Sequence, residues 1–162
     1  MTDNSPLPVG SFTFVLHGAG GDLAKRKIIP ALAHLAKSGY FAAESKIIFA
    51  QREALSPAEA LAQVDAFLQA AGDEAARQSI SALLPFLQTL QVVLGTAQSC
   101  VAMASAVANC PEPVVHYAAL PSSRFIDLIN CIPTVRDPAR LRLVLEKPLG
   151  FNAKESALIE EA

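Results

Sequence analysis

The chain has 162 residues, 52% of them hydrophobic, and a formal net charge of −2 at pH 7. A chain of this size is long enough for one domain that buries about two-thirds of its unfolded surface. The slight negative charge excludes a general attraction to nucleic acid or to an anionic membrane surface, because both partners select basic proteins.

The N-terminal residues 1–8 are polar and contain proline, and they lack the basic region and apolar run of a signal peptide. We therefore expect a flexible segment over residues 1–11 and a cytoplasmic protein. The longest uncharged apolar stretches, such as 28–36 and 101–108, fall far short of the roughly 20 residues that span a bilayer. No membrane role is expected.

A glycine-rich turn follows the first apolar run, residues 12–16, and leads directly into a helical pattern. Gly18, Gly20 and Gly21 allow positive φ and the close approach of a ligand, and the free N–H groups of the helix start favour an anion. The spacing is not G-x-G-x-x-G, because Leu23 stands where the third glycine would be. The turn predicts a phosphate or nucleotide site, and a purely structural strand-to-helix turn is the alternative.

Short apolar runs alternate with longer segments of helical periodicity along the chain. The runs are expected to be five buried strands, at 12–16, 46–50, 90–94, 114–120 and 141–145. The segments between them are expected to be helices, at 22–38, 56–71, 73–88, 97–109 and 122–132. This alternation predicts a doubly wound, Rossmann-like α/β fold with a mostly parallel sheet, helices on both faces, and ligands beyond the carboxyl ends of the strands.

Polar residues follow the second strand, where such folds read the adenosine ribose of a dinucleotide. Arg52 is suited to a 2′-phosphate, although an ordinary solvated arginine is an equal alternative. Glu53 beside it favours an unphosphorylated ribose. This dipeptide therefore leaves the choice between NADP and NAD open.

Four further residues in or next to predicted strands carry groups that could act in binding. His116 and Tyr117 alternate along a strand, so one faces the core and the other reaches the rim, and we interpret His116 as a core residue. His17 precedes the glycine turn and could titrate near a bound phosphate, but the sequence supplies it no catalytic partner. Lys147 is placed to bind an anion or a hydroxyl group, with a solvated surface lysine as the alternative.

Three cysteines, Cys100, Cys110 and Cys131, have no C-x-x-C spacing and no nearby histidines that would complete a zinc site. We interpret them as reduced and mostly buried thiols. No metal site is expected.

Three segments together resemble the coenzyme-domain motifs of the glucose-6-phosphate dehydrogenase family. They are GAGGDLAKRK at 18–27, YAALPS at 117–122 and EKPLG at 146–150, and they occur in the family's order at similar spacing. The segment VVLG at 92–95 also resembles a strand of that domain. The resemblance covers almost the whole chain.

The resemblance implies a domain that binds NADP, with NAD as a second candidate, from an oxidoreductase of the pentose phosphate pathway that converts glucose 6-phosphate to 6-phosphogluconolactone. By analogy, the turn 18–25 holds the pyrophosphate, Arg52 meets the 2′-phosphate, Tyr117 lies near the nicotinamide side, and Lys147 bridges coenzyme and substrate, aimed by a cis bond before Pro148. The coenzyme-binding residues implied in this way are Gly18, Ala19, Gly20, Gly21, Asp22, Leu23, Lys25, Arg52, Tyr117 and Lys147.

Two positions depart from the family pattern. Gly20 stands where the family usually has serine or threonine, which removes one hydroxyl donor to a phosphate. Gln51 stands where the family places its 2′-phosphate arginine, so that Arg52 comes one residue late.

The sequence also lacks the family's His-Tyr-Leu-Gly-Lys segment, which carries the catalytic histidine of a second domain. We therefore expect residues 12–162 to form an NAD(P)-binding domain without the family's C-terminal catalytic domain. No catalytic residue is assigned in this chain, and glucose 6-phosphate would be a partner only if a catalytic domain were supplied. Whether the chain is an enzyme stays open.

Two other functions remain as alternatives. The first is a stand-alone, non-enzymatic nucleotide-binding or regulatory module that partners a full-length dehydrogenase, in a homo-oligomer or a hetero-oligomer. The second is a small reductase that uses Tyr117 or Lys147 as its acid. The separation of these two residues disfavours it, because short-chain reductases place tyrosine and lysine four residues apart on one helix.

Overall fold

A five-stranded, all-parallel sheet in the order β3-β2-β1-β4-β5 forms the middle layer of the molecule. The computed structural model describes residues 10–132, 140–147, 157 and 159. The strands are β1 Thr13–His17, β2 Lys46–Gln51, β3 Leu87–Gln91, β4 Val114–Ala118 and β5 Leu141–Leu145.

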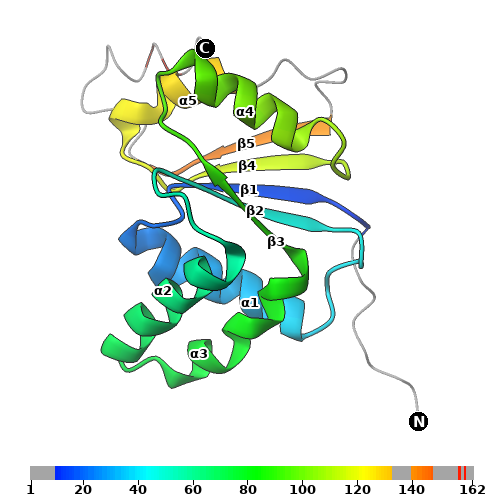
Figure 1. Cartoon of the computed structure of the whole chain (residues 1–162), viewed down its shortest axis with the longest axis vertical. Helices are drawn as coiled ribbons and strands as arrows, with labels where there is room; N and C mark the ends of the chain where they lie inside the picture. Colours follow the sequence, from blue (N-terminus) through cyan, green and yellow to red (C-terminus); the bar gives the residue numbers. More distant parts are fainter. Residues whose placement is uncertain (1–9, 133–139, 148–156, 158, 160–162) are drawn as a thin grey trace.

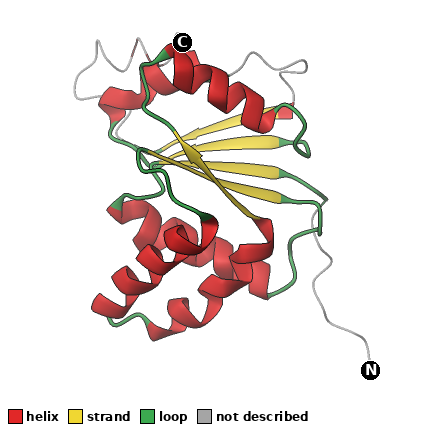
Figure 2. Cartoon of the chain, viewed as in Figure 1, coloured by secondary structure: helices red, strands yellow, loops and turns green. Residues whose placement is uncertain are grey.

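Helices cover both faces of the sheet (Figures 1 and 2). On one face lie α1 Ile29–Lys37, α2 Pro57–Ala70 and α3 Glu74–Ile80. On the other face lie α4 Ala97–Val107 and α5 Phe125–Cys131. The predicted doubly wound, Rossmann-like α/β fold is confirmed. Within the described ranges, no helix is both long and apolar enough to cross a membrane.

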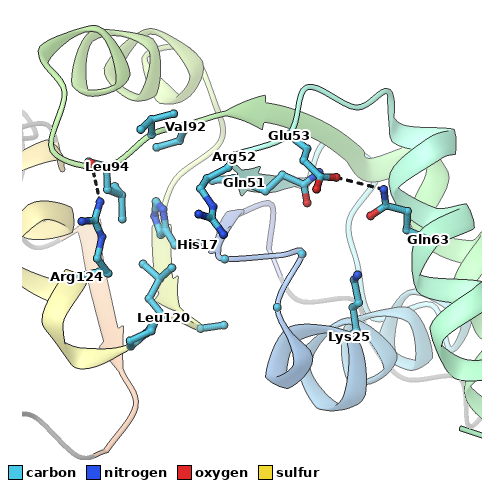
Figure 3. A pocket seen from close by; sticks show the side chains of 17 residues that line it. His17, Lys25, Gln51, Arg52, Glu53, Gln63, Val92, Leu94, Leu120 and Arg124 are labelled. Atoms are coloured by element: carbon cyan, nitrogen blue, oxygen red, sulfur yellow. Dashed lines mark hydrogen bonds between the residues drawn. The ribbon is translucent and has the colours of Figure 1, made fainter.

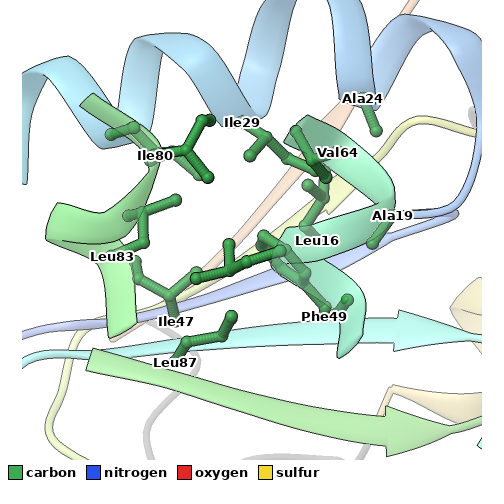
Figure 4. Close-up of a cluster of buried hydrophobic side chains, with 14 of the residues drawn as sticks. Leu16, Ala19, Ala24, Ile29, Ile47, Phe49, Val64, Ile80, Leu83 and Leu87 are labelled. Atoms are coloured by element: carbon green, nitrogen blue, oxygen red, sulfur yellow. The ribbon is translucent and has the colours of Figure 1, made fainter. Parts of the chain in front are cut away.

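Two hydrophobic clusters hold the three layers together. Successive side chains of a strand point to opposite faces, so Leu16 packs beneath α1 to α3 while its neighbour Val15 packs beneath α4 and α5. Figure 4 shows the first cluster, with Leu16, Ile47 and Phe49 from the central strands against Ile29 and Val64 from the helices. Every strand of the centre is thus covered on both sides, which explains the uninterrupted apolar runs in the sequence.

The first helical segment begins differently from the uniform helix predicted over 22–38. A π-helical turn, Ala24–Ile28, leads into α1. Pro30 lies in the first turn of α1 and has no N–H to donate back to the preceding turn, which accounts for the irregular hydrogen bonding there.

The prediction of β3 at 90–94 is wrong by three residues. The helix expected to reach residue 88 ends at Ile80, and a 3-10 segment with Pro85 inside it, Ser81–Phe86, brings the chain to the sheet early. Leu87 therefore pairs with Ile47, and residues 92–94 follow the strand as a loop. The apolar run was mistaken for the strand because it packs against the same core.

The interpretation of the cysteines as three reduced thiols is also wrong. Cys100 of α4 and Cys131 of α5 form a disulfide, and Cys110 is the one free cysteine. The two residues are 31 positions apart, and they meet because α4 and α5 pack side by side on one face of the sheet. Sequence spacing carries no sign of that packing.

Candidate functional site

A pocket of about 630 Å³ opens at the carboxyl ends of β1, β2 and β4 (Figure 3). It is lined by the glycine turn after β1, by residues 50–53 at and beyond the end of β2, and by residues 119–121 after β4. Val92 to Leu94 form another wall. Its volume is within the range of small-molecule and cofactor sites. The position is the one that the parallel topology predicts for a ligand.

The glycine turn is built so that its first glycine cannot be replaced. Gly18 has a φ of +79°, and its N–H donates to the Ala50 carbonyl at 2.9 Å. A Cβ at this position would collide with the Ala119 carbonyl and the Leu120 side chain. The structural explanation of the glycines therefore holds for Gly18.

Gly20 has a different environment. A Cβ there would meet only Gln51 Oε1, at 3.6 Å, which is an ordinary contact distance. Gly20 therefore leaves open space at the pocket wall. Beside it, Gln51 Nε2 is buried and has no hydrogen-bond partner among the residues that the structure describes. An unsatisfied buried donor at the edge of a cavity is a candidate contact for a polar ligand.

Two cations give the pocket its positive charge. Lys25 projects from the helix after the turn and Arg52 from the loop after β2, and both line the cavity (Figure 3). Neither side chain forms an ion pair with any residue in the described part of the chain. The carboxylate of Glu53 instead accepts a hydrogen bond from Gln63 Nε2 at 3.3 Å. The pocket therefore offers unpaired positive charge to an anion.

The opposite wall is mainly apolar and is held in place by Arg124. Its guanidinium donates to the Leu94 carbonyl at 2.6 Å and pairs with Asp127 at 3.0 Å. Leu120 and Val92 lie on the same side of the cavity (Figure 3). These contacts fix the loop after β3 against the start of α5.

Of the ten residues predicted to bind coenzyme, the structure brings five together in this pocket, namely Gly18, Gly20, Gly21, Lys25 and Arg52. Ala19, Asp22 and Leu23 belong to the same turn but do not line the cavity. Ala19 is buried in the core, and Leu23 is 39% exposed. Asp22 pairs with Arg26 at 2.9 Å, and this hydrogen bond lowers the pKa of the Asp22 carboxyl.

Tyr117 and Lys147 lie outside the pocket. The Tyr117 hydroxyl donates to Glu146, its ring stacks on Phe14 with 5.9 Å between centroids, and burial together with Glu146 raises its pKa to about 12. Lys147 is exposed just beyond the end of β5. Pro148, the predicted cis bond before it and Gly150 lie outside the described residues.

Two histidines meet beneath the pocket. His17 Nε2 and His116 Nδ1 are 2.9 Å apart, and the rings stack with 5.2 Å between centroids. Both side chains are buried. Burial, with a smaller effect of His116, lowers the pKa of His17 to about 3, and burial lowers the pKa of His116 to about 4. Both rings are therefore neutral at physiological pH.

The sequence did not identify several residues that line the pocket. Gln63 and Arg124 lie inside predicted helices, where the pattern shows a helix face but not its neighbours. Val92 to Leu94 were assigned to a strand. His17 is the exception, because its position directly before the glycine turn in the sequence indicates that it lies near the pocket.

Comparison with known proteins gives one consistent family. The family model described as "Glucose-6-phosphate dehydrogenase, NAD binding domain" matches residues 15–162. The chain is 31% identical over 144 residues to glucose-6-phosphate 1-dehydrogenase of Helicobacter pylori strain J99, covering 88% of this chain and 33% of the relative. It is 46% identical over 50 residues to the enzyme of the same name from Rhizobium meliloti strain 1021, covering 31% of this chain and 10% of the relative.

A solved structure agrees with these relatives. The chain matches "Glucose-6-phosphate dehydrogenase in complex with its substrate glucose-6-phosphate" with a TM-score of 0.73 and 25% identity, covering 96% of this chain and 34% of the other. The chain thus spans about a third of the length of these two proteins. The resemblance drawn from the three motifs is confirmed, and the chain belongs to the family of glucose-6-phosphate dehydrogenase NAD-binding domains, which bind a nicotinamide dinucleotide.

Proposed function

We propose that this chain is the coenzyme-binding part of a glucose-6-phosphate dehydrogenase and that its pocket binds NADP in preference to NAD. The observation that carries the proposal is the pocket itself. It combines a glycine turn that is open at Gly20 with two cations, Lys25 and Arg52, at the carboxyl ends of the central strands. Neither cation has an ion pair with a described residue. Positive charge beside a glycine turn that leads into a helix suits a dinucleotide pyrophosphate.

The remaining contacts follow from the family resemblance. The backbone of Gly18 to Leu23 and the ammonium of Lys25 would hold the pyrophosphate, and Ala19 and Asp22 would contribute through their main chain. Tyr117 would lie near the nicotinamide side. Lys147 would bridge the coenzyme and a sugar phosphate.

The preference for NADP rests on the different states of Arg52 and Glu53. The Glu53 carboxylate is engaged by Gln63, whereas the Arg52 guanidinium faces the pocket without an acidic partner among the described residues. An arginine in this position suits a 2′-phosphate. A hydrogen bond to a charged group contributes about 1.5–3 kcal/mol, which corresponds to a preference of roughly 10- to 100-fold.

Calorimetric titration of the purified chain with NADP and with NAD tests this function. We expect NADP to bind more tightly, and Arg52→Ala to bring its dissociation constant close to that of NAD. A folded sample that binds neither coenzyme would overturn the proposal. Equal binding of both coenzymes by the unaltered chain would overturn only the preference.

We propose further that the chain does not oxidise glucose 6-phosphate alone. The reaction needs a base within hydrogen-bond reach of the C1 hydroxyl group of the sugar. The histidine of the pocket, His17, has its pKa lowered to about 3 and is a weak base. We expect no coenzyme reduction by the chain alone, and restored formation of 6-phosphogluconolactone when a catalytic domain of the family is fused or co-expressed.

The alternative of a non-enzymatic module that partners a full-length dehydrogenase differs in its requirement for a second protein. Its support is the exposure of apolar side chains, 47% for Val93 and 67% for Val101. Analytical ultracentrifugation with and without a full-length dehydrogenase would separate the two functions. A cytoplasmic location stays a prediction from the N-terminal sequence.

A further inference from the structure

We propose that His17 is an additional ligand-binding residue of the pocket, whose Nδ1–H donates a hydrogen bond to a phosphate oxygen of the bound dinucleotide. His116 is the positioning residue that makes this N–H available. The proposal rests on the proposed function and adds to it a contact that the motifs do not contain.

The position of His17 favours such a contact. It is the last residue of β1 and directly precedes Gly18, so its ring stands at the base of the turn that would hold the pyrophosphate. Only 1% of the residue is exposed, yet it lines the cavity. Figure 3 shows its ring between Arg52 and the apolar wall of Leu94 and Leu120. Because bulk water is excluded at such a position, a hydrogen bond to the ring is stronger there than in water.

The contact with His116 decides which nitrogen of His17 carries the proton. One N–H must lie between His17 Nε2 and His116 Nδ1, which are 2.9 Å apart. If His17 donated it, the proton of His116 would be on its Nε2, which is buried and has no hydrogen-bond partner in the described part of the chain. Buried N–H groups without an acceptor are rarer than buried acceptors without a donor. The more stable arrangement therefore has His116 Nδ1–H donating to His17 Nε2.

The consequence for His17 is a fixed tautomer. With Nε2 acting as the acceptor, a neutral His17 carries its proton on Nδ1, the ring nitrogen turned away from His116. Burial keeps both rings neutral, in agreement with the lowered pKa of each. His17 is thus a neutral hydrogen-bond donor to an anionic ligand. It orients the ligand without adding positive charge to the pocket.

Two substitutions of His17 test the contact, one that keeps a hydrogen-bond donor at the position of Nδ1 and one that removes it. In asparagine the amide nitrogen is bonded to Cγ, as Nδ1 is in histidine, so His17→Asn retains a donor at that place. His17→Leu removes it. We expect the dissociation constant for NADP to rise tenfold or more in His17→Leu and by less than threefold in His17→Asn. His34→Asn, on an exposed face of α1, is the matched control and should not change it.

Nitrogen-15 NMR of the unaltered chain gives a second readout that does not depend on a variant folding. The chain has only three histidines, so their ring signals can be assigned by single substitutions. We expect His17 as the Nδ1–H tautomer, a shift of its Nδ1 signal on addition of NADP, and loss of the fixed tautomer in His116→Leu.

The outcomes separate the two proposals. If the unaltered chain binds no coenzyme, the proposed function fails and this contact fails with it. If it binds NADP but His17→Leu binds equally well, or His17 is the Nε2–H tautomer, only the contact is overturned.

Discussion

A Cβ added to Gly18 would lie 2.5 Å from the carbonyl oxygen of Ala119, so the start of the turn after β1 and the end of β4 are in contact through bare backbone. Gly18→Ala therefore combines a steric clash with an unfavourable left-handed φ. We expect a loss of about 2–5 kcal/mol in the free energy of unfolding, measured by denaturant titration.

Gly72→Ala is the matched control for this substitution. Gly72 has a similar φ of +72° but nothing within 4 Å of an added Cβ. Gly72→Ala should lower the free energy of unfolding by about 1–2 kcal/mol, which is the contribution of the left-handed backbone conformation alone. Equal losses in the two variants would show that the contact with Ala119 is unimportant.

Gly20→Ser should be tolerated and should strengthen coenzyme binding. The added Cβ would lie at ordinary contact distance, 3.6 Å, from Gln51 Oε1, and φ at this residue is not in the left-handed region. One new hydrogen bond to a charged phosphate contributes about 1.5–3 kcal/mol, or a dissociation constant roughly 10- to 100-fold lower. Gly10→Ser, where an added Cβ meets nothing within 4 Å, is the control. Weaker binding by Gly20→Ser would mean that the ligand itself occupies this space.

The Cys100–Cys131 disulfide should leave one reactive thiol, Cys110, in the unreduced chain and three after reduction under denaturing conditions. A loop closed over 31 residues contributes about 3–4 kcal/mol by its effect on the unfolded chain. Cys131→Ser should therefore lower the stability by that order. Cys110→Ser should lower it by no more than about 1 kcal/mol, because the serine hydroxyl can donate to the Ala106 carbonyl in place of the weak Sγ–H donor.

Alkylation of thiols at the moment of cell lysis would show which state exists in the cell. A reducing cytoplasm keeps most cysteines as thiols. Three alkylated cysteines in the folded chain would contradict the disulfide in that compartment.

The stability of the chain should fall as the pH is lowered from 6.5 towards 4. Burial lowers the folded-state pKa of His17 to about 3 and that of His116 to about 4, below the ordinary histidine value of 6.5. In this window the unfolded chain binds more protons than the folded one, so stability is present above pH 6.5 and is lost as the pH decreases. Each histidine contributes a slope of up to about 1.4 kcal/mol per pH unit.

Unfolding measured between pH 5 and 7 checks this dependence. His116→Leu should reduce the slope, because it removes one of the two buried histidines. An unchanged slope in this variant would show that the buried pair does not titrate as described.

The sequence predicted the elements whose signal is local. The helix predicted over 56–71 matches α2, which begins with a capping box in which Glu59 N donates to Ser56 Oγ at 3.3 Å. The glycine turn was readable for the same reason. Both features depend on residues within a few positions of each other.

The errors concern features that depend on packing between distant segments. The apolar run at 90–94 predicts a strand, whereas β3 is Leu87–Gln91, because a buried loop and a buried strand have the same composition. The pairing of Cys100 with Cys131, the contact of His17 with His116 and the place of Arg124 against Leu94 all join residues 30 or more positions apart. No local pattern records such contacts.

The strand order gives the pocket an origin that is independent of its lining. Neighbours β1 and β4 send their following segments to opposite faces, β1 to α1 and β4 to α5 (Figure 1). Such a topological switch point opens a crevice in any parallel sheet. Substitutions such as glycine at 20 or glutamine at 51 can therefore retune which nucleotide is preferred while the crevice persists. The connectivity of the strands determines that the crevice exists, and a few side chains determine which nucleotide it prefers.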